Sequence, residues 1–321
     1  MARAEPTDMD AYGESDGQDI AAGAGATLIT WDESRNGSGS GSGPVATTAR
    51  NWSPPPCWYA PRWTPSEFGE WFEVAWDLDN FSAGHSGSAA VSMWNHYERG
   101  EPYEDFNAEE EGNGMWWAAV QNPNEQDILE RGACSAIPFW VEDGETPEVE
   151  NAISPEILAE LAYERIRVPA TEVTLSPADH SEQVVNLPTW IWAENGDFSE
   201  VAVTASLDIL GISATTTARP TSLRIEAGTG DADLHPGSGE CAVNADGSVG
   251  EPYADGRSGE TPPCGVTYHR ATHQAGSYPM SASVTWEISW EGSGGSGGTL
   301  PNAVFETTHD LQVREVQTIV R

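Results

Sequence analysis

The sequence contains no lysine: all 14 basic residues are arginines, set against 51 aspartates and glutamates, and the formal net charge is −37. Without lysine there is no P-loop lysine and no Schiff-base lysine, and the zinc-protease pattern H-E-x-x-H is also absent. This excess of negative charge repels phosphate backbones and anionic lipid. No apolar run approaches the roughly 20 residues of a transmembrane helix. We therefore expect no nucleic-acid partner and no transmembrane segment.

Cysteine is scarce, and no two of the four cysteines form a C-x-x-C pair or lie at zinc-knuckle spacing. The simplest of the three pairings joins Cys57 to Cys134 and Cys241 to Cys264. The second pair lies in Pro/Gly-rich sequence, where a covalent closure stabilises most. We expect these two disulfides and an oxidising compartment; four reduced, buried thiols in a cytoplasmic protein are the alternative.

The first residues, MARAEPTDMD, lack the basic start and apolar stretch of a signal peptide. Two explanations are open: the protein is cytoplasmic, or Met1 lies downstream of the true start. Ala2, Arg3 and Ala4 have the small-x-small pattern that ends many signal sequences, which favours the second explanation. Together with the cysteines, this predicts a secreted or cell-envelope protein.

Composition divides the chain into four parts. Residues 1–50 combine an acidic start with a Gly/Ser alternation and are predicted to be disordered, except that 27–31 suit a short strand. Residues 51–150 form a Trp- and Cys-rich α+β module that holds nine of the 14 tryptophans. Residues 151–168 are predicted to be a connecting helix, and 169–321 an antiparallel β-sandwich domain.

The clearest helix of the Trp-rich module begins after Thr64, which is expected to be the N-cap, with Pro65 at the first position and Glu67 completing a capping box. Five apolar side chains then recur at the spacing of one helical face: Phe68, Trp71, Phe72, Ala75 and Trp76. We interpret this face as part of the core, with a sugar-stacking platform as the alternative.

From residue 168 onward the apolar pattern has a period of two, which indicates strands. The strongest example is VTWEISWE at 284–291, where the apolar residues occupy one face. Eight or so short strands, divided by turn signals and with almost no helix, predict an Ig-like antiparallel sandwich. The fold class is therefore expected to be mainly β.

Motifs for catalysis are absent. GHSGS at 84–88 departs from G-x-S-x-G, and the six carboxylates between Glu101 and Glu111 lack the order of a calcium loop. We expect no catalytic residue, no cofactor and no metal. A hydrolase with paired carboxylates is the remaining enzymatic alternative, since a chain with 51 acidic residues always contains suitable pairs.

Trp190 and Trp192 lie two residues apart in LPTWIW and share one face of an extended segment. Two interpretations are open. Both side chains belong to the core, or they form an exposed aromatic pair that binds a sugar or a protein partner.

Five segments of this chain resemble segments of a known group of proteins. They are WSPPPCWY at 52–59, LPTWIW at 187–192, GEPY at 250–253, TPPCGVTY at 261–268 and VTWEISWEG at 284–292. On these residues, 51–321 resemble a family of secreted or cell-envelope proteins of mycelial actinobacteria such as Streptomyces. The family has no assigned activity, so no catalytic residue is carried over. The resemblance implies export and an association with a pilus-like secretion apparatus.

The sequence thus predicts a non-enzymatic extracytoplasmic protein that is a structural or binding component at the cell envelope. Its partner would be an envelope protein or a glycan. A carbohydrate-binding module that uses exposed tryptophans is the first alternative, and the hydrolase is the second.

Overall fold

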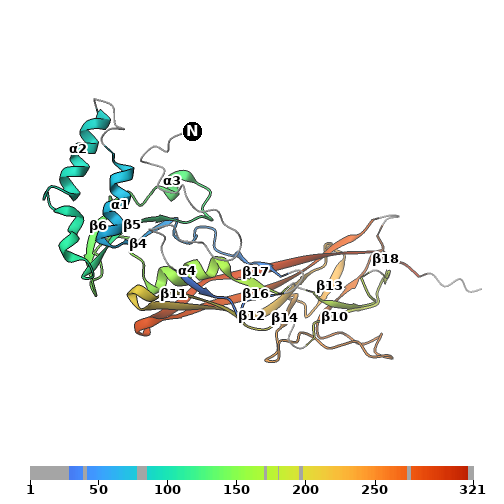
Figure 1. Cartoon of the computed structure of the whole chain (residues 1–321). Helices are drawn as coiled ribbons and strands as arrows, with labels where there is room; N and C mark the ends of the chain where they lie inside the picture. The colour runs from blue at the N-terminus through green and yellow to red at the C-terminus, as the bar shows by residue number, and fades with distance from the viewer. Residues whose placement is uncertain are drawn as a thin grey trace, which may run out of the picture. The chain divides into compact units, whose positions relative to one another are not determined.

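The computed structural model describes residues 29–38, 42–77, 85–169, 172–179, 181–194, 198–272 and 276–316. The chain is mainly β, with antiparallel sheets, and divides into two compact units (Figure 1). The first unit contains Pro55–Ile157 and the short segment Leu207–Gly211. The second contains Trp31–Pro54, Leu158–Ser206 and the chain from Ile212 onward.

The first unit is built on a three-stranded antiparallel sheet with helices that follow its strands. The strands, in sheet order, are β4 (Cys57–Trp63), β5 (Gly114–Gln121) and β6 (Phe139–Glu142). The helices are α1 (Pro65–Ala75), α2 (His85–Tyr97), the 3-10 helix η2 (Asp105–Glu110) and the single turn α3 (Ile128–Arg131). The α+β character predicted for this region is therefore present.

Helix α1 begins as the sequence predicts. The Glu67 N–H donates to the Thr64 hydroxyl at 3.4 Å, and the Thr64 N–H donates to the Glu67 carboxylate at 2.9 Å. Phe68 and Phe72 are completely buried, whereas Trp71 and Trp76 are half-buried. Both phenylalanines belong to a buried cluster of the unit that also contains Trp63, Tyr97, Phe106, Trp116 and Ala118. The core interpretation of this helical face is confirmed.

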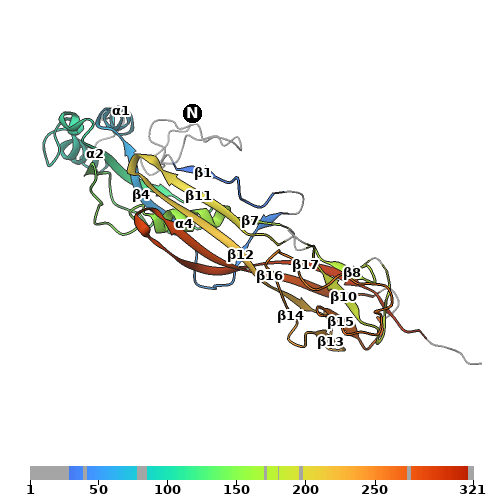
Figure 2. The same ribbon diagram turned by 90° about the horizontal axis from the view of Figure 1, so that it is seen from below.

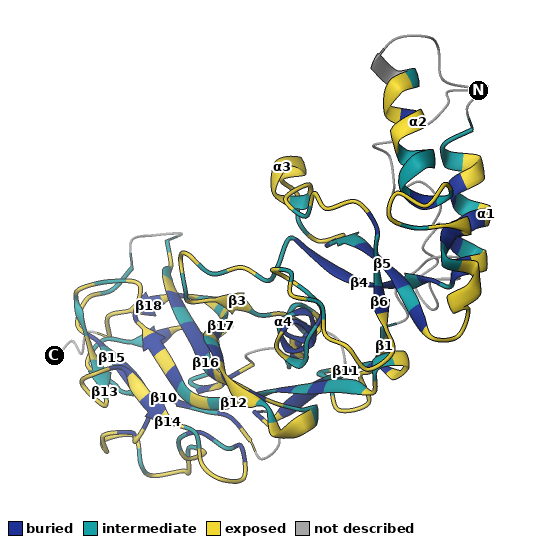
Figure 3. Ribbon diagram, turned by 90° about the vertical axis from the view of Figure 1, so that its left-hand side faces the viewer, coloured by how far each residue is buried: buried dark blue, intermediate teal, exposed yellow. Residues whose placement is uncertain are grey.

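The second unit is built on a seven-stranded sheet that curls into a half-barrel around helix α4 (Pro155–Arg165) (Figure 3). Six of its strands follow one another in the order β1 (Thr30–Asp32), β11 (Val201–Leu207), β12 (Ile212–Glu226), β16 (Tyr278–Gly292), β17 (Gly297–Leu311) and β3 (Ala46–Thr47). The seventh strand, β14 (Glu240–Ala242), also pairs with β12. The Thr216 hydroxyl on β12 donates to the Ala159 carbonyl of α4 at 2.8 Å, which fixes the helix on the inner face.

A four-stranded sheet lies at one end of these long strands (Figure 2). Its order is β13 (Ala232–His235), β15 (Gly265–Tyr268), β10 (Thr189–Trp192) and β8 (Thr174–Ser176). Two small two-stranded sheets complete the unit: β18 (Val313–Arg314) with β9 (Gln183–Val184), and β2 (Gly43–Pro44) with β7 (Arg167–Val168).

Strand β16 explains why the alternating pattern is so clear in the sequence. One face of it is buried along its whole length, by Met280, Ala282, Val284, Trp286, Ile288 and Trp290. The pattern was correct, but the strands are longer than expected. The segments 212–217 and 223–225 belong to one strand, β12, whose register shifts between Pro220 and Ser222.

Within residues 1–50, the strand expected at 27–31 overlaps β1, whereas β2 and β3 lie in a part that was expected to be disordered. The physical reason is a set of contacts with the end of α4. The Asn36 amide donates to the Arg165 carbonyl at 2.9 Å and accepts from the Arg167 N–H at 2.8 Å. The Arg165 guanidinium lies 4.1 Å from the ring centre of Trp31. Residues 1–28 and 39–41 lie outside the described part of the chain.

Candidate functional site

All four cysteines form disulfides, in the pairing that the sequence predicts. Cys57 bonds to Cys134 across 77 residues in the first unit, and Cys241 bonds to Cys264 across 23 residues in the second. Cys241 lies on β14 of the seven-stranded sheet, and Cys264 directly precedes β15 of the four-stranded sheet. The second disulfide therefore links the seven-stranded sheet of that unit to the four-stranded sheet.

The tryptophan pair on β10 is not an exposed platform. Trp190 is only 1% exposed, and one face of its ring is covered by the Arg257 guanidinium at 4.3 Å. The edge of Tyr253 also packs against it, with ring centres 5.9 Å apart. Trp192 is half-buried. Trp190 thus belongs to the core, so the structure does not bring the two tryptophans together as a stacking surface.

Arg257 is itself held in place, which makes the cover over Trp190 part of the fold. Its guanidinium forms ion pairs with Glu260 at 2.8 Å and Glu251 at 3.1 Å. These residues belong to the long excursion 228–263 that the Cys241–Cys264 disulfide anchors. No sequence pattern indicates the contact between Arg257 and Trp190.

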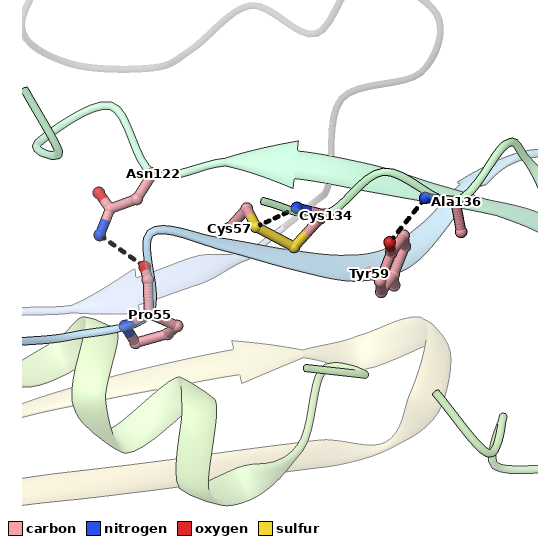
Figure 4. The surroundings of a disulfide bond; sticks show 6 residues. All are labelled: Pro55, Cys57, Tyr59, Asn122, Cys134 and Ala136. Carbon is pink, nitrogen blue, oxygen red and sulfur yellow. Dashed lines mark hydrogen bonds between the residues drawn. A yellow bond between two sulfur atoms is a disulfide. The ribbon is translucent and has the colours of Figure 1, made fainter. Parts of the chain in front are cut away.

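The first disulfide anchors a loop, residues 122–138, that we call the stapled loop (Figure 4). The Asn122 amide donates to the Pro55 carbonyl at 3.1 Å, where the loop leaves β5. The Cys134 N–H donates to the sulfur of Cys57 at 2.9 Å, and the Ala136 N–H donates to the Tyr59 hydroxyl at 2.9 Å. Both ends of the stapled loop are therefore fixed to the region of strand β4.

Short-range hydrogen bonds order the middle of the stapled loop. The Asn122 side chain accepts from the Asn124 N–H at 2.9 Å, and the Glu125 carboxylate accepts from the Asp127 N–H at 2.8 Å. The Asp127 carboxylate then accepts from the Leu129 N–H at 2.8 Å, which caps α3. Successive turns are thus held by side chains of the loop itself.

The stapled loop displays apolar side chains to solvent. Ile128 is 74% exposed and Leu129 is 84% exposed, both on α3, and Ile137 is 47% exposed near the end of the loop. The ribbon of α3 is coloured as exposed in Figure 3. Burying an aliphatic side chain of this size stabilises a complex by about 1.5–3 kcal/mol. A loop that is ordered by a disulfide and side-chain hydrogen bonds, yet buries neither Ile128 nor Leu129, has the character of a docking element.

The unit that carries the stapled loop is strongly acidic. Between Pro55 and Ile157 the sequence contains 21 aspartates and glutamates against three arginines, a formal charge of −18. Glu125, Asp127 and Glu130 flank Ile128 and Leu129 in the sequence, and Arg131 is the one basic residue of the stapled loop, whose formal charge is −2. The apolar tip is therefore flanked mainly by carboxylates.

This site was missed from the sequence. Ile128 and Leu129 are an isolated apolar pair between acidic residues, with no helical or strand periodicity. The available signal was their position inside the interval closed by Cys57 and Cys134, in a segment rich in Asn, Asp and Glu. This position indicates a loop but does not by itself predict that the pair is exposed.

Two observations bear on the metal-dependent and paired-carboxylate alternatives. Within the described ranges, no group of three His, Cys, Asp or Glu side chains is arranged to hold a metal ion. A cleft of about 710 Å³ in the second unit is lined by Glu172, Glu194 and Glu200. Glu200, however, is bound by Arg35 at 2.9 Å and by Arg219 at 3.0 Å, so its carboxylate is engaged in ion pairs.

Comparison of the chain with protein-family models, with curated proteins and with solved structures finds no match. Among the described helices, none is long and apolar enough to cross a membrane. The site is therefore interpreted from its own chemistry.

Proposed function

We propose that this chain is a non-enzymatic extracytoplasmic protein that binds another protein at the cell envelope. The observation that carries the proposal is the stapled loop: the Cys57–Cys134 disulfide holds in place a loop whose Ile128 and Leu129 project into solvent. Disulfides persist in oxidising compartments, and exposed aliphatic side chains on an ordered loop are typical of protein-binding surfaces.

The oxidised state of both cysteine pairs supports an extracytoplasmic location. The actinobacterial origin and the association with a pilus-like secretion apparatus are proposals that rest on the sequence resemblance. A carbohydrate-binding function has less support, because Trp190 is buried under Arg257. The hydrolase has less support as well, because Glu200 is paired with two arginines.

We also propose that part of the second unit is an Ig-like sandwich. Its two layers would be the four-stranded sheet and the portion of the seven-stranded sheet formed by β12, β14 and β16. Support comes from the Cys241–Cys264 disulfide, which joins a strand of one layer to the start of a strand of the other.

The test of the function is the thiol state and location of the protein in its native source. Intact cells and culture medium are treated with a membrane-impermeant maleimide, and then denatured with and without reduction. We expect the protein in the medium or envelope fraction, with four alkylations only after reduction. Four free thiols on protein recovered from the cytoplasm would refute the proposal.

A further inference from the structure

We propose that the stapled loop inserts Ile128 and Leu129 into an apolar cleft of a partner protein whose rim is basic and includes lysine side chains. This inference rests on the proposed function and specifies the chemistry of the partner. It follows from three properties of the loop: its exposed apolar side chains, its order before binding, and its charge.

The apolar pair supplies the affinity. Ile128 and Leu129 are adjacent on the single turn α3 and are the two most exposed aliphatic side chains of the loop. Burial of both in a cleft contributes about 3–6 kcal/mol, which corresponds to at least 100-fold in the dissociation constant. An apolar floor in the partner is therefore required.

The order of the loop reduces the entropic cost of binding. The disulfide, the Tyr59 contact and the Asp127 cap hold the loop in one conformation. A flexible loop of this length would lose conformational freedom on docking, whereas this loop has lost it on folding. An apolar pair can then act as an anchor although its area is small.

The charge identifies the partner as basic. Glu125, Asp127 and Glu130 would lie at the rim of any cleft that receives Ile128 and Leu129. A second copy of this chain presents the same unit with a charge of −18, and an anionic membrane carries the same sign. Carboxylates next to an apolar anchor are instead complementary to ammonium and guanidinium groups, which also speed encounter.

The absence of lysine provides a selective test. A carbodiimide joins carboxylates to amines, and no side chain of this protein carries an amine. Bonds formed from Glu125 or Glu130 to a lysine therefore report another protein and never the side chains of a second copy. The carboxylates of Glu125 and Asp127 each accept a backbone N–H of the loop, so Glu130 is the preferred reporter.

The experiment compares three proteins produced in the native source: wild type, the double variant I128S/L129S, and the control V74S. Val74 on α1 is 81% exposed and has acidic neighbours, Glu70 and Glu73, so it matches the exposure and charge of the tip. After carbodiimide treatment of intact cells, the bonds are mapped by mass spectrometry. Hydrogen exchange of each variant verifies that the loop keeps its fold.

We expect bonds from Glu125 or Glu130 to lysines of one basic protein in wild type and V74S, and at least a tenfold lower yield in I128S/L129S. With the purified partner, the double variant is expected to bind about 100-fold more weakly. Equal yields in all three proteins, or bonds spread over Glu70 and Glu73 as well, would overturn the inference. If the protein is secreted and fully disulfide-bonded but shows no cross-link from Glu125 or Glu130 to a lysine, only this inference is refuted. The proposed function then stands.

Discussion

Removal of the Cys57–Cys134 disulfide is expected to destabilise the first unit strongly. The bond closes a segment of 77 residues, and the chain-entropy relation gives a loss of about 4.5 kcal/mol at 25 °C for its removal. The same relation gives about 3.4 kcal/mol for the 23-residue segment between Cys241 and Cys264. The double variant C57A/C134A should therefore lose more stability than C241A/C264A.

The assay is guanidinium unfolding of the two double variants and the wild type, followed by tryptophan fluorescence. Nine of the 14 tryptophans lie between residues 51 and 150, so this signal reports the first unit strongly. Wild-type protein reduced with dithiothreitol and kept reduced serves as the control and should match a variant that lacks both disulfides. A loss below about 1 kcal/mol for C57A/C134A, or the reverse order of the two variants, would refute the reasoning.

Three further results are expected. Asn36→Ala removes the hydrogen bonds to the Arg165 and Arg167 backbone and should lower the free energy of unfolding by about 1–3 kcal/mol. The control Asn244→Ala, at an exposed position, should change it by less than about 0.5 kcal/mol. Equal effects of the two substitutions would contradict the contacts seen at the end of α4. Burial raises the pKa of the Tyr97 hydroxyl above its usual range, so the stability that the neutral hydroxyl contributes is present below a pH of about 10 and is lost as the pH rises further. The variant Tyr97→Phe should therefore lose stability less steeply than the wild type as the pH is raised above about 10. An equal dependence of stability on pH in the two proteins would count against burial of this hydroxyl. Arg257→Ala should uncover Trp190 and increase quenching of fluorescence by acrylamide, while unchanged quenching would mean that other groups cover the ring.

The elements that the sequence predicted are those whose signals are local. The capping box at Thr64 and Glu67 and the apolar spacing after it lie within a few turns of one helix, so α1 was predicted almost to the residue. The alternation in 284–291 reflects one buried face of β16 and needs no knowledge of its partners. The disulfide pairing followed from the position of each cysteine in its half of the chain.

Helix α2 was missed because its start is rich in glycine and serine, which composition assigns to a loop. Its later part nevertheless contains Ala90, Met93, Trp94 and Tyr97, which have the spacing of a helical face, and Ala90 and Tyr97 are completely buried. Tertiary burial of this face overrides the weak helix propensity of the first turn.

Other features depend on contacts between distant segments. Asn36 meets Arg165 across 129 residues, and no pattern near residue 36 indicates that meeting. The same holds for Trp190, whose burial depends on Arg257. Exposure of Ile128 and Leu129 is likewise a property of the folded loop, because only the folded structure shows that the described residues leave 74% and 84% of them exposed.

The measurement that tests the account most directly is hydrogen exchange of residues 122–138 in the isolated protein, with the Cys57–Cys134 disulfide intact and after its removal. The account predicts slow exchange at the N–H groups of Leu129, Cys134 and Ala136 in the oxidised protein, and much faster exchange in C57A/C134A. Fast exchange at these amides in the oxidised protein would contradict the claim that the disulfide holds an ordered docking loop.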